Sequence, residues 1–173
     1  MRAAAFRRIV TMDQTGLLEK LLGFLENHRI SYCVIGGQAV NAYVEPLVSL
    51  DLDIAVVVED IRSLIEALRE SFRITLHAHS INIELSGSDL RAQIQTDPRY
   101  AAFVPPAERR EVLGHSMPVA RLEDVLAGKV WAAMDPERRG SKRQKDLADI
   151  ARILEAYPQL RKQVPESVRK HLV

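Results

Sequence analysis

The first candidate for chemistry is the pair of carboxylates in the segment Ser49-Leu50-Asp51-Leu52-Asp53. Side chains alternate between the two faces of a β-strand, so Asp51 and Asp53 project from one face, roughly 7 Å apart at the backbone. Mutual repulsion and burial both disfavour the charged forms of two neighbouring acids, and a divalent cation removes both penalties. These hard oxygen ligands suit Mg²⁺. Two solvated aspartates at the end of a strand would give the same pattern, so this second interpretation stays open.

A glycine pair, Gly36-Gly37, lies between a predicted strand and a predicted short helix. Glycine lets the backbone approach a ligand closely, and the N-terminus of a helix offers free N–H groups, so this turn could cradle a phosphate. A simple tight turn is the alternative. The chain contains neither Gly-x-Gly-x-x-Gly nor a P-loop motif, which disfavours dinucleotide and Walker-type sites.

Two charged residues lie on apolar helix faces in the C-terminal part of the chain. Lys129 falls inside an apolar stripe at helical spacing, where a lysine either reaches the edge of the core or faces a pocket that requires a fixed cation. Asp146 heads the next apolar stripe and should therefore point toward the protein. The preference of acidic groups for the first turn of a helix is the other explanation for Asp146.

A dense basic segment directly precedes Asp146 and comprises Arg138, Arg139, Lys142, Arg143 and Lys145. It could be a solvated loop, or it could hold the phosphates of a nucleic acid. No aromatic residue interrupts it, so base stacking by this segment is not predicted. A basic RNA-binding domain is thus one functional hypothesis, and the formal net charge of only +1 weighs against it.

The composition is that of an ordinary globular protein. The chain has 173 residues, of which 47% are hydrophobic and 27% are charged, and this balance excludes wholesale disorder. Cys33 is the sole cysteine, so no intrachain disulfide can form. The longest apolar run, residues 54–58, is too short to span a bilayer, and we expect a cytoplasmic protein without membrane contact. The Arg-rich residues 1–8 leave a transit peptide as an alternative.

Hydrophobic periodicity predicts the elements that position these residues. A helix capped by Asp13 ends at Asn27-His28, and a strand at 50–58 should be central because both of its faces become apolar. The remaining segments are expected as strands at 32–35, 73–76, 81–85 and 90–95, a weak strand or loop at 111–119, and helices at 38–43, 61–72, 121–134, 142–157 and 165–172. This order predicts an α+β fold: a mixed sheet flanked by helices (residues 1–120) and a helical C-terminal portion (residues 121–173), packed as one compact unit.

The combination of these features resembles a known superfamily. A helix, a strand, Gly36-Gly37, a helix and then Ser49-x-Asp51-x-Asp53 resemble nucleotidyltransferases with the DNA polymerase β-type palm. Lys129 followed by Lys145-Asp146-Leu147-Ala148-Asp149 is similar to the AbiEii-type nucleotidyltransferases, which include toxins of bacterial toxin–antitoxin pairs. The resemblance spans roughly residues 15–157.

The resemblance implies a role for each matching residue. Asp51 and Asp53 would hold Mg²⁺ (or Mn²⁺), and Lys129 would pair with phosphate. Asp146 would be a polar or catalytic group. The nucleotide would lie against a set of residues near the glycine turn, namely Gly36, Gly37, Gln38 and Ser49. An antitoxin protein is the implied partner.

One departure from the superfamily pattern concerns a third carboxylate that many members carry on a later strand. Gln93 stands where that acid would fall, and its amide oxygen could coordinate a metal without bringing charge. The usual glycine-serine pair is also replaced, since Gly37 is followed by Gln38. The resemblance implies transfer of a nucleoside monophosphate from an NTP to a hydroxyl of RNA, protein or a small molecule. The alternative is a catalytically inactive nucleotide- or partner-binding module with the same fold.

Overall fold

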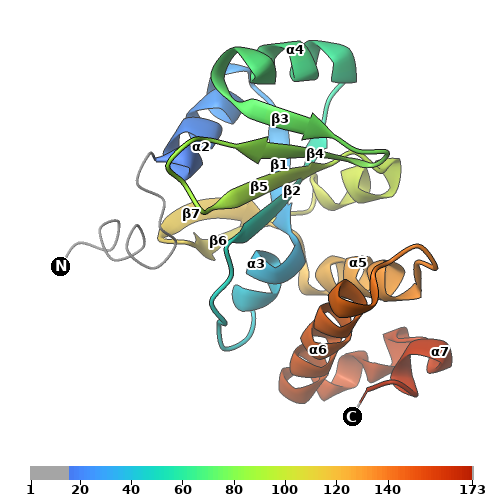
Figure 1. Cartoon of the computed structure of the whole chain (residues 1–173). Coiled ribbons are helices and arrows are strands. Elements are labelled where there is room, and N and C mark those ends of the chain that lie inside the picture. Colours follow the sequence, from blue (N-terminus) through green and yellow to red (C-terminus); the bar gives the residue numbers. More distant parts are fainter. Residues whose placement is uncertain (1–15, 173) are drawn as a thin grey trace.

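The computed structural model describes residues 16–172 and contains a seven-stranded mixed sheet with helices on both faces (Figure 1). The strand order is β3-β4-β5-β2-β1-β7-β6. The strands are β1 (Ser31–Ile35), β2 (Asp51–Val57), β3 (Arg73–Leu76), β4 (Ser80–Glu84), β5 (Arg91–Gln95), β6 (Glu108–Val112) and β7 (His115–Val119). The predicted α+β architecture is confirmed.

Strand β2 lies at the centre of the sheet, as its apolar composition predicts. It pairs antiparallel with β1 and parallel with β5, so no backbone edge of β2 is exposed. Leu52 and Ile54 are each 1% exposed and point into the core, while Asp51 and Asp53 take the opposite face. The central strand of the sheet therefore carries the two acids.

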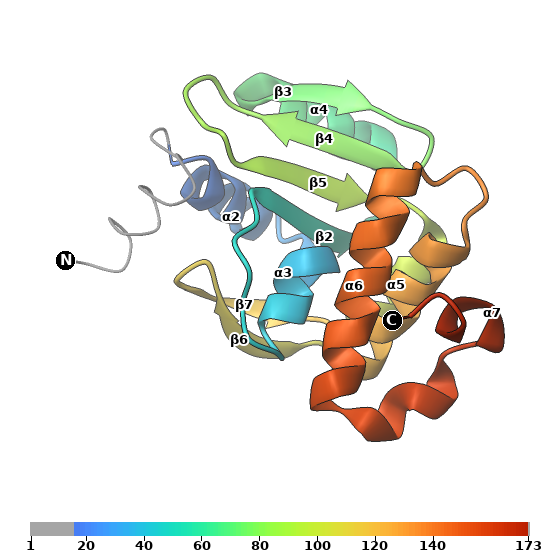
Figure 2. The ribbon, with the colours of Figure 1, turned by 60° about the horizontal axis from the view of Figure 1, so that its bottom comes forward.

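The two faces of the sheet are covered differently (Figure 2). Helices α2 (Leu17–Asn27) and α4 (Ile61–Ser71) lie behind the sheet in this view and bury their leucine stripes against it. Helices α3 (Gly36–Asn41), α5 (Leu122–Met134) and α6 (Gly140–Ala156) lie in front, on the face that carries the acids. The Asp13 cap predicted for the first helix lies outside the described residues.

The C-terminal helices continue through two short elements, the 3₁₀ helix η2 (Pro158–Gln163) and helix α7 (Glu166–Arg169). The end of α6 is joined to the sheet portion, because the Tyr157 hydroxyl donates a hydrogen bond to the Tyr43 carbonyl oxygen at 3.0 Å. The division at residue 120 remains a prediction. No helix within residues 16–172 has both the length and the apolar character needed to cross a membrane.

Two segments differ from the pattern-based expectation. The weak strand or loop expected at 111–119 is a β-hairpin of β6 and β7, which turns at Leu113 and Gly114. Both turn residues have positive φ angles, 51° for Leu113 and 78° for Gly114, and this combination favours a tight hairpin. The leucine at position 113 does not predict such a turn from the sequence. The irregular stretch after Asp97 contains the 3₁₀ helix η1 (Pro98–Phe103), which Asp97 caps by accepting a hydrogen bond from the Arg99 amide.

Candidate active site

The two acids and two residues of β5 form adjacent rows on one sheet face. In the parallel pairing of β2 with β5, Asp51 lies opposite Arg91 and Asp53 lies opposite Gln93. Directly paired residues share a face of the sheet. Gln93 therefore lies beside Asp53, in the place where the sequence comparison expects a third carboxylate.

Asp53 is a part-buried acid without a partner. No hydrogen bond or ion pair within residues 16–172 reaches its carboxylate. Burial, reinforced by the nearby Asp51 carboxylate, raises the pKa of Asp53 from 3.8 to about 6, although the positive charges of Lys129, Lys142 and Arg138 oppose the rise. A desolvated carboxylate with no ligand of its own is a position where a bound cation would lower the free energy.

Gly36 makes the space around that carboxylate. It has a φ angle of 68°, in the left-handed region that glycine enters without steric cost. A Cβ atom at this position would collide with Asp53 Oδ2 and would lie 3.1 Å from the Asp53 Cβ. Gly37, the next residue, is different: a Cβ there would meet nothing within 4 Å. Of the predicted glycine pair, Gly36 is the residue whose lack of a side chain the site requires.

A cavity of about 90 Å³ joins most of the predicted site residues. Its lining includes Gly36, Asp53, Gln93, Lys129, Arg138 and Asp146. A water molecule occupies about 30 Å³ of liquid volume, so the cavity has room for an ion and a few waters but not for a nucleotide. A nucleotide bound here would therefore extend outward from the cavity over the open sheet face.

Lys129 points into this cavity from α5 and is held by two acids of α6. Its Nζ lies 3.1 Å from Asp146 Oδ1 and 2.8 Å from Asp149 Oδ2. Burial alone would lower the pKa of Lys129, but the two carboxylates together outweigh burial and raise it. The ammonium group therefore stays charged at neutral pH, as a fixed cation facing the site.

Asp146 is almost completely buried and holds two cations at once. Its side chain is 3% exposed, and its second oxygen, Oδ2, accepts a hydrogen bond from Arg138 Nε at 2.9 Å. The sequence prediction that Asp146 points toward the protein is confirmed. Removing one partner of a buried ion pair leaves an uncompensated charge, so Asp146 fixes the positions of both Lys129 and Arg138.

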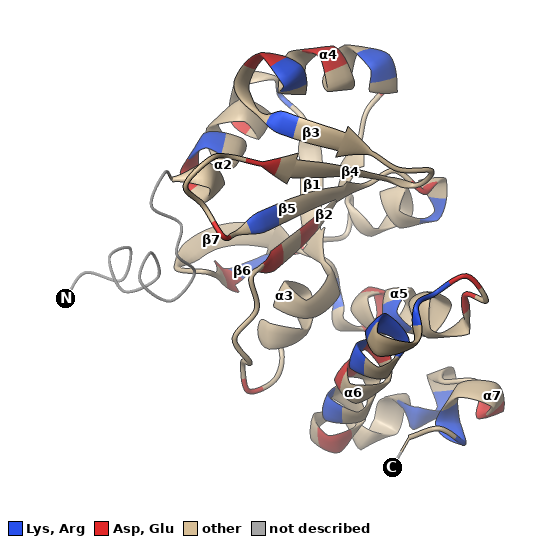
Figure 3. Ribbon diagram, in the orientation of Figure 1, with Lys and Arg blue, Asp and Glu red and all other residues tan. Residues whose placement is uncertain are grey.

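The basic segment before Asp146 divides its charges between the site and the protein. Figure 3 shows Lys and Arg residues concentrated on the first turns of α6. Arg138 and Lys142 lie close enough to lower the pKa of Asp53, whereas Arg143 donates its hydrogen bonds to the carbonyl oxygens of Ala133 and Asp135. Part of the segment thus supplies positive potential to Asp53, and part of it ties α6 to α5.

Asp51 differs from Asp53 in both exposure and pairing. Its side chain is 48% exposed, and its Oδ1 lies 2.9 Å from Arg91 Nε. Asp51 and Asp53 thus share a face, as predicted. Within residues 16–172, Asp51 forms an ion pair with Arg91, whereas Asp53 forms none.

The loop before β2 is held in place by side-chain hydrogen bonds. Gln38 is 4% exposed and donates through Nε2 to the Ser49 carbonyl oxygen, and Ser49 Oγ accepts from the Asp51 amide. Asn41 brackets Leu47 by donating to its carbonyl oxygen and accepting from its amide. Nucleotide contacts by Gln38 and Ser49 stay predictions; what these residues do in this structure is set the start of β2.

Helix α6 fastens the same loop from the other side. Arg152 donates to Asp149 Oδ1 at 2.8 Å, to Asn41 Oδ1 at 3.0 Å and to the Glu45 carbonyl oxygen at 2.6 Å. Because Asp149 also holds Lys129, one chain of contacts runs from the fixed cation of the site to the loop that precedes the acids.

Several residues of the site carry no recognisable sequence signal. Tyr100 and Phe103 of η1 line the cavity, and their rings pack with Trp131 at centroid distances of 5.4 Å. Gly128 lies beneath Tyr100, where a Cβ atom would come within 3.2 Å of the ring. By contrast, Asp149 belongs to the segment that carries the family resemblance, and it follows Asp146 by one helical turn.

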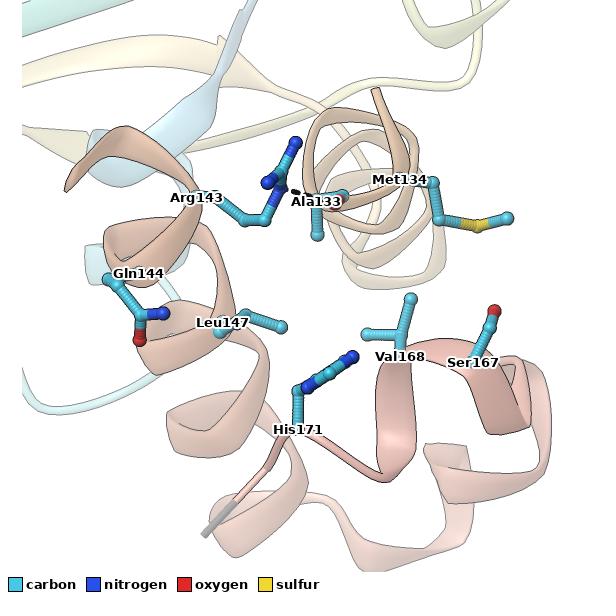
Figure 4. A pocket seen from close by; sticks show the side chains of 8 residues that line it. All are labelled: Ala133, Met134, Arg143, Gln144, Leu147, Ser167, Val168 and His171. Atoms are coloured by element: carbon cyan, nitrogen blue, oxygen red, sulfur yellow. Dashed lines mark hydrogen bonds between the residues drawn. The ribbon is translucent and has the colours of Figure 1, made fainter. Parts of the chain in front are cut away.

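A larger cavity lies between α5, α6 and α7 and has a different character (Figure 4). Its volume is about 460 Å³, and apolar side chains such as Leu147 and Val168 point into it. Its lining contains no Asp or Glu, so it offers no carboxylate to a cation. Asp53, Lys129 and Arg138 line the smaller cavity, whereas Asp51 lies outside it on the same sheet face.

Comparison with known protein families gives one match. A family model described as "Nucleotidyl transferase AbiEii toxin, Type IV TA system" matches residues 34–172. This range includes every residue of the cavity described above. No curated protein matches the chain significantly.

Several solved structures share the fold of this chain. The solution structure of the antibiotic-resistance factor ANT(2'')-Ia covers 91% of this chain and 95% of its own, with 14% identity and a TM-score of 0.55. The alignment with the lincosamide antibiotic adenylyltransferase LnuA, bound to lincomycin, covers 82% of this chain and 98% of LnuA, with 13% identity and a TM-score of 0.53. The alignment with a nucleotidyltransferase-like protein from Paracoccidioides brasiliensis covers 90% of this chain and 84% of that protein, with 17% identity and a TM-score of 0.53. These likenesses show the fold.

The two glycines of the turn allow a matched pair of substitutions, because only Gly36 has a left-handed φ angle and lies against Asp53. We expect Gly36→Ala to lower the free energy of unfolding by about 1–2 kcal/mol or more, because a left-handed φ angle disfavours alanine and the added methyl group displaces Asp53. Gly37→Ala is the control and should leave stability unchanged or slightly raised, because alanine suits a helix better. Chemical denaturation measures both. Equal effects of the two substitutions would contradict this account.

The raised pKa of Asp53 predicts a pH-dependent effect on stability. Between the unfolded value near 3.8 and the folded value of about 6, the folded protein binds the proton more tightly, so ionisation destabilises the fold as pH rises. We expect Asp53→Asn to stabilise the metal-free protein by roughly 1–3 kcal/mol near pH 7.5 and to have no effect below about pH 4.

Denaturation in the presence of a chelator, at both pH values, checks this expectation. Asp51→Asn is the control, since Asp51 is half exposed and already paired with Arg91. Stabilisation by Asp53→Asn of equal size at the two pH values would show that the charge of Asp53 is not its cause.

Proposed function

Because the chain belongs to the AbiEii family of nucleotidyltransferases, we propose that it transfers a nucleoside monophosphate from an NTP to a hydroxyl group, with Mg²⁺ or Mn²⁺ as cofactor. The acceptor is proposed to be RNA, a protein or a small molecule. The family description names a toxin of a type IV toxin–antitoxin system, so a cognate antitoxin is the proposed protein partner.

The observation that carries the proposal is the unpartnered carboxylate of Asp53 beside Gly36. The residues fit a divalent metal, because Asp53 offers a desolvated oxygen ligand, Asp51 offers a second carboxylate on the same face, and Gln93 offers an amide oxygen. Mg²⁺ commonly takes one or two carboxylates and completes its shell with waters and substrate phosphates. When bound, the metal would supply positive charge to the triphosphate and to the reacting oxygens.

The chain's own cations would bind the rest of the triphosphate charge. Lys129 stays protonated in its pair of carboxylates, and Arg138 and Lys142 contribute positive potential at the same acids. In phosphoryl transfer the protein acts chiefly by positioning and by charge neutralisation. Here Asp146 would act indirectly, since it holds Lys129 and Arg138 in place.

The reaction replaces one bond at phosphorus with another. The acceptor oxygen would attack the α-phosphorus, the bond to the bridging oxygen would break, and pyrophosphate would leave with that electron pair. The cavity of about 90 Å³ would hold the ion and its nearest ligands. The nucleoside and the acceptor would then meet over the polar sheet face next to Asp51.

Gln93 favours a second candidate function, a nucleotide- or partner-binding module without turnover. Its position beside Asp53 leaves the site with two acids instead of three, and residues 16–172 contain no cluster of three or more His, Cys, Asp or Glu side chains placed to hold a metal. Glutamine cannot act as a base and brings no charge to a metal.

Ligand binding tests the site that both functions share. We expect Mn²⁺ plus a nonhydrolysable NTP to raise the free energy of unfolding of the wild type by about 2.7 kcal/mol at a hundred times the Kd. Asp53→Ala and Asp51→Ala should lose most of this gain, whereas Asp89→Ala, an exposed acid in the turn between β4 and β5, should keep it. Equal gains in the wild type and in Asp53→Ala would remove the metal site.

Turnover separates the two candidate functions. Incubation with labelled NTPs and a panel of RNA, protein and small-molecule acceptors should release pyrophosphate, and Asp53→Ala should lower that rate at least a hundredfold, about the loss that removal of a major charge-stabilising group causes. Binding without turnover on any acceptor would favour the silent module. In that case Gln93→Asp, which supplies the missing carboxylate, is the variant expected to gain activity.

A further inference from the structure

Arg91 stands out among the cations of the site because its partner is one of the proposed metal ligands. Arg91 Nε lies 2.9 Å from Asp51 Oδ1, and the two residues are paired directly across β5 and β2. Lys129 and Arg138, in contrast, are bound to acids of α6 that the proposed metal does not need. A metal ion and Arg91 therefore compete for the same carboxylate.

The exposure of this ion pair makes it easy to exchange. The side chains of Arg91 and Asp51 are 63% and 48% exposed, and ion pairs so open to water contribute little to stability. The backbone of Arg91 is fixed independently, because its amide donates to the Leu50 carbonyl oxygen at 2.8 Å. Releasing the guanidinium thus costs little and leaves the strand in place.

The sheet register determines which groups the Arg91 guanidinium can reach. Arg91 shares the face of Asp51, Asp53 and Gln93, which is the face over which the proposed function places the nucleotide. A guanidinium group binds phosphate oxygens with two parallel hydrogen bonds. Once Asp51 turns to a metal ion, phosphate is the anion within reach of the freed guanidinium.

We propose that Arg91 is an exchangeable counter-ion that holds Asp51 in the free protein and moves to the triphosphate when metal and nucleotide bind. This proposal rests on the proposed function, because it requires a metal on Asp51. It makes the two ligands cooperative: the nucleotide removes Arg91 from Asp51 and so favours the metal, and by linkage the metal favours the nucleotide by the same factor.

Equilibrium binding to the full chain tests this exchange. Mn²⁺ affinity is measured by electron paramagnetic resonance of the free ion, with and without a nonhydrolysable NTP, for the wild type and Arg91→Gln. We expect Arg91→Gln to bind Mn²⁺ alone about two- to fivefold more tightly, since an exposed ion pair no longer competes. The same variant should bind Mn²⁺ less tightly than the wild type once the NTP is present.

Arg73→Gln is the matched control. Arg73 is an exposed arginine opposite Glu84, two strands from β5, and its loss changes the net charge equally without touching the acids of the site. Arg73→Gln should leave both Mn²⁺ affinities within twofold of the wild type.

The outcomes separate this inference from the function on which it rests. If the wild type binds no Mn²⁺ even with the NTP, the proposed metal site is wrong. If the wild type binds Mn²⁺ but Arg91→Gln shows unchanged affinity alone, or an unchanged effect of the NTP, the site stands and the role of Arg91 is overturned.

Discussion

The candidate active site depends on one carboxylate, that of Asp53, which the fold partly buries and which has no partner among residues 16–172. Asp53 lies on the central strand of the sheet, beside Gly36, whose lack of a side chain leaves space for the carboxylate. Burial of an unpaired acid costs stability, and the cost is visible as a pKa raised to about 6. A fold that retains such a group in an otherwise well-packed sheet has the property expected of a functional position.

The neighbouring cations form their ion pairs with other acids and not with Asp53. Lys129 and Arg138 lie close enough to Asp53 to lower its pKa, yet their hydrogen bonds go to Asp146 and, for Lys129, to Asp149. The acids of α6 thereby keep the cations fixed and charged while Asp53 stays open. Positive potential and an available anionic ligand in one small cavity suit a metal–triphosphate complex, which carries both signs of charge.

Much of the sheet and its two acids could be predicted from the sequence because local patterns determine them. Alternation placed Asp51 and Asp53 on one face, the apolar residues of β2 indicated a central strand, and Asp146 fell on an inward stripe. The family resemblance seen in the sequence is confirmed by the match over residues 34–172.

The remaining features depend on contacts between distant segments. The β6–β7 hairpin has a Leu-Gly turn that resembles no common hairpin signal, and the Tyr100 ring of η1 packs closely over Gly128, a contact between distant segments. Arg91 lies opposite Asp51 because of the register between the parallel strands β2 and β5, and tertiary packing sets that register. No local pattern carries that information.

The most direct test of the central claim is a crystal structure of the protein with Mn²⁺ and a nonhydrolysable NTP, located by the anomalous signal of manganese. The account predicts a manganese peak bound by the carboxylates of Asp51 and Asp53, with the triphosphate adjoining Gly36. A nucleotide bound elsewhere on the protein, with the carboxylate of Asp53 still free of any ligand, would contradict it.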